Sequence, residues 1–363
     1  MVGSLLRPPE IHAAREKLAA GEIDSDELRA IEDGFVQDAV ALQRDAGLKV
    51  ATDGDFHRAH WFMDFFTKID GIEVRGGLPQ RFQNEGGEIE FAPPKLVTTA
   101  KLKRSQPLAS HDYAGLNAIL VETGNGLTGK QCIPSPTIAH FRGGRAGVDE
   151  TVYPDIEDFY EDLAQVYRDE IQALYDAGCR YLQIDETNLP FLCDPKIRAQ
   201  AESIGEDPDQ LLPRYAQLIN QCVRDAPDDM AVCIHMCRGN HESSWVADGG
   251  YDPVAEVAFG DINVDGFFLE YDSPRAGGFA PLRYLTGDKV AVLGLMTTKR
   301  PDLEPKEDVI RRINEAADIV PLDRLALSPQ CGFASTIGGN TLTVDDEKAK
   351  LAQVVEIAAE VWG

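Results

Sequence analysis

The sequence predicts an α/β fold and, within that class, a (β/α)8 TIM barrel. Short apolar runs recur along the chain, each followed by a polar or glycine-rich turn and usually by a helical pattern. Polar residues cluster just after these runs along the whole chain, which favours a barrel over a doubly wound sheet. The predicted strands are 48–53, 131–136, 180–185, 231–236, 266–271, 290–296 and 325–329, with Val2-Gly3-Ser4 as a truncated eighth.

The segments between the apolar runs carry helical periodicity. In 25–46, apolar residues recur three or four positions apart, the spacing of one helix face. Gly178 follows a second such segment and is a candidate C-cap. Thr343 and Asp346 have the spacing of a capping box for the last helix. The predicted helices are 25–46, 155–177, 207–224, 305–317 and 344–361.

Residues 71–104 do not follow this alternation of strand and helix patterns, and they are rich in Gly, Gln and Glu. In 88–91 apolar residues alternate with charged ones, which is a strand period, and 96–98 offers a partner strand. We therefore predict a β-hairpin insertion near the active face. No internal repeat or domain linker stands out, so residues 1–363 are predicted to form a single domain.

The composition excludes several classes of protein. With 43% hydrophobic and 26% charged residues, the chain is typical of a globular protein with a large core. A formal net charge of −26 disfavours binding to nucleic acid or to an anionic membrane surface. Residues 1–8 lack the pattern of a signal peptide, and no apolar run approaches the ~20 residues of a membrane span. Seven cysteines without an export signal indicate reduced thiols and a cytoplasmic location.

The strongest chemical signal is a His-x-Cys pair at the end of an apolar run. Residues i and i+2 of a strand point to the same side, so His235 and Cys237 could both bind one metal ion. Glu270 and Cys331 end two other predicted strands and are further candidate ligands. Nitrogen and sulfur ligands favour zinc, although each residue alone is as easily a structural one.

Polar residues at other strand ends are candidates for substrate binding. Asp185 and Glu186 end one predicted strand, where a carboxylate could hold an ammonium group or cap a helix. Asp55 has the same two interpretations. Ser4 follows a glycine and could offer its hydroxyl to a carboxylate, unless the terminus is disordered.

Aromatic and basic residues lie near these positions. Trp61 and Phe141 could stack on a flat ligand or pack in the core. The loop Arg142-Gly143-Gly144-Arg145 is basic in an acidic protein, so it could meet an anionic substrate or simply be solvated.

These residues resemble those of the cobalamin-independent methionine synthase family, in particular its short bacterial relatives that correspond to the catalytic domain. The resemblance covers nearly the whole chain. Its markers are Val2-Gly3-Ser4, Asp53-Gly54-Asp55-Phe56, Ile133-Pro134-Ser135-Pro136-Thr137, Gln183-Ile184-Asp185-Glu186, His235-Met236-Cys237-Arg238-Gly239-Asn240, Phe268-Leu269-Glu270-Tyr271-Asp272 and Ser328-Pro329-Gln330-Cys331-Gly332.

The resemblance implies a (β/α)8 barrel, a bound zinc ion and homocysteine as the acceptor. It implies zinc ligands at His235, Cys237, Glu270 and Cys331, and homocysteine contacts at Ser4, Asp55 and Asp185. Asp55 stands where the long enzymes have Glu, so its side chain is one methylene shorter.

Three departures from the long enzymes concern the methyl donor. Their N-terminal half, with its basic surface for a polyglutamate tail, has no counterpart here. Lys299 lies in the segment where they carry a proposed proton-donating His, so Lys299 or no residue takes that catalytic role. Phe141 aligns with the Trp that stacks on the folate ring.

The sequence therefore predicts a cytoplasmic, zinc-dependent methyltransferase that methylates a thiol, with homocysteine as the expected thiol and methionine as product. The donor would be a methyltetrahydrofolate or another methyl carrier. The oligomeric state stays open, a homo-oligomer included. One alternative is a zinc-dependent alkyltransferase that joins a different thiol to an epoxide or other electrophile. A second is a metal-free barrel of the uroporphyrinogen-decarboxylase type, and a third is a binding protein without turnover.

Overall fold

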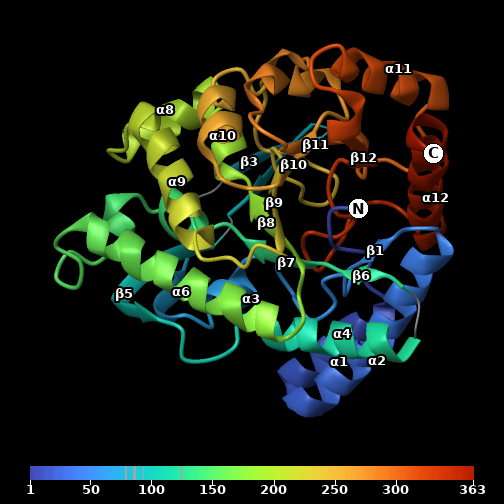
Figure 1. Ribbon diagram of the computed structural model, residues 1–363. Coiled ribbons are helices and arrows are strands. Elements are labelled where there is room, and N and C mark those ends of the chain that lie inside the picture. The colour runs from blue at the N-terminus through green and yellow to red at the C-terminus, as the bar shows by residue number, and fades with distance from the viewer. Residues whose placement is uncertain (78–79, 85–86, 93, 124–125) are drawn as a thin grey trace.

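The protein has a parallel α/β architecture with the strands at the centre and helices around them (Figure 1). The computed structural model describes residues 1–77, 80–84, 87–92, 94–123 and 126–363. Six parallel strands form one sheet in the order β12-β11-β10-β9-β8-β7, and β1 pairs with β6 in a second parallel sheet. The parallel strands are β1 (Val50–Ala51), β6 (Thr128–Gly129), β7 (Gln131–Pro134), β8 (Tyr181–Glu186), β9 (Ala231–Met236), β10 (Gly266–Glu270), β11 (Val290–Met296) and β12 (Leu325–Pro329).

The two parallel sheets adjoin each other in the chain. Only Lys130 separates β6 from β7, and its N–H donates to the last carbonyl of β1 at 2.8 Å. At the opposite edges of the two sheets, the N-terminal segment forms no strand but makes backbone hydrogen bonds on both of its sides. The Leu5 N–H donates to Gly54 O at 3.0 Å, and the Phe333 N–H donates to Ser4 O at 2.9 Å. The N-terminal segment therefore lies between β1 and the turn after β12 (Figure 1).

The five helices predicted from periodicity are present as α2, α6, α9, α11 and α12, and their ends follow local capping. Thr343 and Asp346 form the predicted capping box, and Gly178 has φ 97° just after its helix. The α-helices are α1 (Pro9–Ala20), α2 (Ser25–Asp45), α3 (Met63–Phe66), α4 (Ser110–Thr123), α5 (Ile138–Phe141), α6 (Ile156–Asp176), α7 (Asn188–Phe191), α8 (Pro195–Ser203), α9 (Pro208–Val223), α10 (Ala255–Asp261), α11 (Lys306–Ala317) and α12 (Val344–Trp362). Turns of 3₁₀ helix lie at Arg145–Gly147, Pro274–Ala276, Ala280–Tyr284 and Leu322–Arg324. Among the described helices, none combines the length and apolar character that crossing a bilayer requires.

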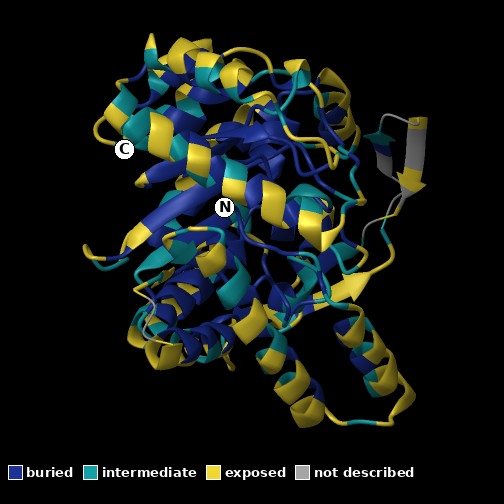
Figure 2. Ribbon diagram, turned by 90° about the vertical axis from the view of Figure 1, so that its right-hand side faces the viewer, coloured by how far each residue is buried: buried dark blue, intermediate teal, exposed yellow. Residues whose placement is uncertain are grey.

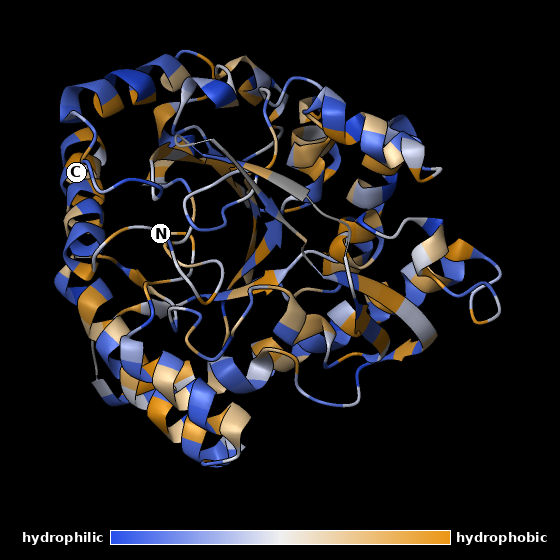
Figure 3. Cartoon of the chain, turned by 180° about the vertical axis from the view of Figure 1, so that it is seen from behind, coloured by the Kyte–Doolittle hydropathy of each residue, from blue (hydrophilic) through white to orange (hydrophobic). Residues whose placement is uncertain are grey.

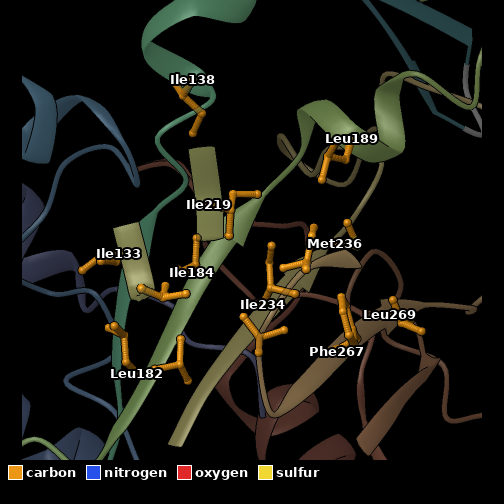
Figure 4. Packing of buried hydrophobic residues seen from close by; sticks show 14 of the residues in the cluster. Ile133, Ile138, Leu182, Ile184, Leu189, Ile219, Ile234, Met236, Phe267 and Leu269 are labelled. Atoms are coloured by element: carbon orange, nitrogen blue, oxygen red, sulfur yellow. The ribbon is translucent and has the colours of Figure 1, made fainter. Parts of the chain in front are cut away.

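The main core lies between the parallel strands and the helices that cover them. The strands are buried, whereas the helices expose one side (Figure 2) and are polar on that side (Figure 3). Ile184, Ile234 and Phe267 belong to this core and are fully buried (Figure 4). Because side chains alternate along a strand, every second residue of these strands points to the other face of the sheet, away from the helices. That face carries Asp185, His235 and Glu270.

Antiparallel strands fill most of the range 71–104, in which a hairpin was predicted. β2 (Asp70–Arg75) pairs with β5 (Lys95–Lys103), and between them β3 (Gln80–Asn84) pairs with β4 (Gly87–Phe91). The partner expected for 88–91 is therefore wrong, because β4 pairs with 80–84 and not with 96–98. Segment 80–84 is only two residues away from β4 in the chain, so closing that connection costs less conformational entropy than closing the longer connection to 96–98. The sequence offers little alternation in 80–84 to reveal it.

Candidate active site

A single pocket receives side chains from segments far apart in the chain. Its walls come from the N-terminal segment, the ends of β8 and β9 and the turns after β1 and β12. These strands are parallel, so their carboxyl ends meet on one side of the sheets, and loops from that side converge. The pocket is therefore placed as the active sites of parallel β/α enzymes are.

His235, Cys237 and Cys331 meet in this pocket. His235 is the penultimate residue of β9, Cys237 follows β9, and Cys331 lies in the turn after β12. The alternation along β9 sends Ile234 and Met236 into the main core, whereas His235 and Cys237 point toward the pocket. One ligand atom from each of the three lies within 4.8 Å of the other two, and all three residues are buried.

The donor set of this cluster suits a zinc ion. Both ring nitrogens of His235 are buried and, within the described part of the chain, neither has a hydrogen-bond partner. A buried imidazole without partners is unfavourable, and a metal ion would satisfy it. Two sulfurs and one imidazole nitrogen are ligands that zinc prefers. The residues present therefore fit the metal that the sequence predicts.

The two thiols of the cluster differ in acidity. Contact with the Cys237 sulfur lowers the pKa of the Cys331 thiol well below its usual value, and His235 acts in the same direction. The same contact, together with burial, raises the pKa of Cys237. Burial lowers the pKa of His235, but Cys331 and Asp185 more than offset this and raise it overall. Of the two thiols, Cys331 is therefore the one that loses its proton more readily.

The Glu270 carboxylate does not join the three-residue cluster in this structure. It is fully buried at the end of β10 and accepts hydrogen bonds from the Arg238 backbone N–H and from Arg275 Nη2, both at 2.5 Å. The nitrogen of Lys299 lies 3.7 Å from its Oε1 and 3.4 Å from Asp272 Oδ2. Burial raises the pKa of Glu270, but the three cationic side chains outweigh this and hold it at about 2. Lys299 contacts these carboxylates and does not line the pocket. This position argues against its predicted role as a proton donor.

Ser4, Asp55 and Asp185 line the same pocket as the cluster. The Ser4 hydroxyl accepts a hydrogen bond from the Ala334 N–H at 3.2 Å. Asp55 has a positive φ of 61° and forms a buried ion pair with Arg58. Burial raises the pKa of Asp55, although Arg58 opposes the shift. Burial likewise raises the pKa of Asp185 to about 6.

Two residues predicted to bind substrate lie elsewhere. Glu186 is fully buried, and its carboxylate accepts hydrogen bonds from Thr137 Oγ1 at 2.6 Å and from the Leu189 N–H at 2.9 Å. It therefore caps the start of α7, the alternative that the sequence left open. Phe141 packs against Phe191, with ring centres 6.2 Å apart, and is not part of the pocket wall.

Aromatic residues other than Phe141 form part of the pocket wall. Trp61 lines the pocket as predicted, together with Phe62 and Phe191. Arg58 is the main residue that sequence reasoning missed. Its only sequence signal is its position three residues after Asp55, and a turn conformation at Asp55 is needed to bring the two side chains together.

These observations define the class of protein: a parallel α/β protein whose buried imidazole and two thiols meet in a pocket at the carboxyl ends of its strands. Comparison with known proteins narrows this class. The chain belongs to the family of the cobalamin-independent synthase catalytic domain, whose family model matches residues 1–360. The family predicted from the sequence motifs is thereby confirmed.

Relatives with close similarity span the whole chain. Uncharacterized protein YxjH of Bacillus subtilis is 45% identical over 363 residues, covering 99% of this chain and 93% of that protein. The crystal structure of a putative vitamin-B12 independent methionine synthase from Listeria monocytogenes is 38% identical, with a TM-score of 0.80, and covers 100% of this chain and 96% of that one. The 5-methyltetrahydropteroyltriglutamate–homocysteine methyltransferase of Bacillus licheniformis is 23% identical over 370 residues, which are 42% of its length. The family is one of methyltransferases, and this chain is an enzyme of that class.

Proposed function

We propose that this protein is a zinc-dependent methyltransferase that methylates the thiol of homocysteine to give methionine. The methyl donor would be a methyltetrahydrofolate or another methyl carrier. The observation that carries the proposal is the convergence of His235, Cys237 and Cys331 in a pocket that also exposes Ser4 and Asp185. Membership of the family supports the reaction class.

His235, Cys237 and Cys331 would hold the zinc ion. When bound, zinc lowers the pKa of a coordinated thiol, so that the acceptor sulfur is a nucleophilic thiolate at neutral pH. The lowered pKa of the Cys331 thiol would favour the deprotonated sulfur that a cation binds. The proposed assignment of Glu270 as the fourth ligand requires its carboxylate to leave Arg275 and the Arg238 N–H. With such competing partners, Glu270 would be the most weakly held of the four proposed ligands.

The remaining pocket residues would orient the amino acid. Asp185 and Asp55 offer carboxylates to the ammonium group of homocysteine, and the Ser4 hydroxyl offers a donor to its carboxylate. Such positioning turns a bimolecular reaction into one between fixed partners and supplies much of the rate. The methyl group would move by in-line displacement onto the sulfur. We assign no proton transfer to Lys299, because Glu270 and Asp272 surround its amine.

We also infer that the parallel strands close into one (β/α)8 barrel and that residues 1–363 form one domain. The bonds of the N-terminal segment to Gly54 on one side and Phe333 on the other support this closure. In such a barrel the N-terminal segment takes the place of a strand and carries Ser4 into the site. The antiparallel strands between residues 70 and 103 would then be an insertion in a loop of the barrel.

The proposal is tested by metal analysis combined with zinc-edge X-ray absorption on the whole protein. We expect about one zinc per chain, with two sulfur ligands in the free enzyme and a third after addition of homocysteine. Cys331→Ser is the variant expected to lose one sulfur from both spectra, and Cys222→Ser, a buried cysteine in α9, is the matched control. Full methyl transfer by metal-free protein, or no added sulfur with homocysteine, would refute the proposal.

A further inference from the structure

Arg142 is a cationic side chain of the active-site pocket that forms no ion pair with any residue that the structure describes. Arg142 follows α5 and lines the pocket, and its guanidinium carbon lies 5.5 Å from the centre of the Phe62 ring. Its Nη1 is buried and, among the residues that the structure describes, has no hydrogen-bond partner. Burial lowers the pKa of Arg142 to about 10, and no neighbouring carboxylate offsets this shift. The group is therefore charged at neutral pH, and its Nη1 has no partner in the described part of the chain.

The loop that carries Arg142 is held in place by its neighbours. The N–H groups of Gly143 and Gly144 donate to His140 O at 3.0 and 2.7 Å. Arg145, the other arginine of the loop, donates from its guanidinium to the Val148 and Tyr153 carbonyls at 2.9 and 2.7 Å. Arg145 is thus occupied in fixing the loop, whereas Arg142 is presented to the pocket.

The carboxylates on the pocket wall have other partners. Asp55 pairs with Arg58, and Asp185 Oδ1 accepts a hydrogen bond from Gln183 Nε2 at 2.6 Å. In a protein with 61 acidic and 35 basic residues, the half-buried Arg142 has a buried Nη1 without a hydrogen-bond partner among the described residues. An unpaired buried charge is costly, and a bound anion would compensate for it.

We propose that Arg142 binds an acidic group of the methyl donor, so that the donor is an organic anion bearing a carboxylate or a phosphate. This inference rests on the proposed function only in naming the ligand as the methyl donor. Phe62, which lies beside Arg142, and Phe191, elsewhere on the pocket wall, would contact a flat or apolar part of the same molecule. Arginine suits this role because its planar donors match both oxyanions in a bidentate manner.

The inference is tested by calorimetric binding to the zinc-loaded, full-length protein. The probes are methyltetrahydrofolate, its dimethyl ester, in which the carboxylates are blocked, and phenyl phosphate. The variants are Arg142→Gln and Arg142→Lys, and the matched control is Arg311→Gln, which removes an exposed arginine that pairs within α11. Circular dichroism verifies that each variant is folded.

We expect Arg142→Gln to weaken the binding of at least one acid by about 10- to 100-fold, the range of a charge-assisted hydrogen bond. Arg142→Lys should recover part of this loss, and Arg311→Gln should cause none. Binding of the ester should be the same in wild type and Arg142→Gln. A larger loss for phenyl phosphate identifies a phosphate donor, and a larger loss for the folate identifies a carboxylate donor.

Three results would overturn the inference: unchanged affinity of Arg142→Gln for both acids, an equal loss for acid and ester, or no binding of either acid to wild type. The proposed function fails in a different way. If wild-type enzyme transfers no methyl group to homocysteine while Arg142 still governs anion binding, the reaction is misassigned and the anion site stands.

Discussion

The contact between Gly332 and Ser4 allows a direct test of the substrate site. Gly332 follows Cys331 and packs against the N-terminal segment. A Cβ at this position would lie 3.0 Å from Ser4 N and 3.1 Å from Ser4 Cβ, and closer still to Ser4 Oγ. The overlap with Ser4 Oγ cannot persist, so Gly332→Ala must move the Ser4 hydroxyl, and the tight contacts to Ser4 N and Cβ push its backbone in the same direction. The Phe333 N–H to Ser4 O hydrogen bond of 2.9 Å would be disturbed by the same movement.

The size of the effect follows from the displacement. Relieving the overlap requires a shift of about 1 Å, and a misplacement of that size in an active site costs up to about 100-fold in rate. We therefore expect kcat/KM for homocysteine to fall by about 10- to 100-fold in Gly332→Ala, mainly through a higher KM. Ser4→Ala removes one hydroxyl without moving the backbone, so its loss should be smaller, about 2- to 10-fold.

The assay is steady-state methyl transfer with homocysteine varied, together with zinc content. Gly34→Ala in α2 is the control, since a Cβ there meets nothing within 4 Å and the variant should be fully active. An unchanged KM in Gly332→Ala would refute the role of Ser4. Loss of zinc would mean that the alanine moves Cys331 and not Ser4, and would equally contradict the reasoning.

Three further predictions concern the metal, the substrate and stability. His235→Ala should lose zinc and nearly all activity while its circular dichroism stays native, and a variant with full zinc content would remove His235 from the ligand set. Asp185→Asn should raise KM for homocysteine about tenfold, as expected for a lost charged hydrogen bond; an unchanged KM would exclude that contact. Glu347→Gln should stabilise the protein at pH 8. Burial raises the pKa of Glu347 in the folded state to about 8 from 4.5, so this carboxyl group loses its proton first in the unfolded state as the pH rises. The wild-type protein therefore loses stability between pH 4.5 and 8. The cost that Glu347→Gln relieves is at most about 5 kcal/mol, and urea unfolding at pH 5 and pH 8 should show a smaller difference for the variant than for wild type.

Regular secondary structure and the metal cluster could be predicted from the sequence because their signals are local. The capping box at Thr343 depends on a residue three positions away, and the inward direction of His235 and Cys237 depends on the alternation along one strand. Cys331 could be added because parallel strands bring their carboxyl ends to one side. The pairing of 80–84 with β4 could not be predicted, because polar side chains hide its strand period.

The sequence by itself determined which residues have the chemistry for a metal site, where seven of the parallel strands and five of the helices lie, and that the protein is acidic. Only the tertiary structure decided which groups each charged side chain near the site contacts. Glu270 lies against Arg275 and Lys299, and Glu186 caps a helix. Arg142 lines the pocket with an Nη1 that has no partner among the described residues, whereas Arg145 donates to two backbone carbonyls. The physical reason is that a strand or helix is specified by neighbours in sequence. The partners of these buried charges include residues tens of positions away, such as Thr137 for Glu186 and Lys299 for Glu270, and only the folded chain brings them together.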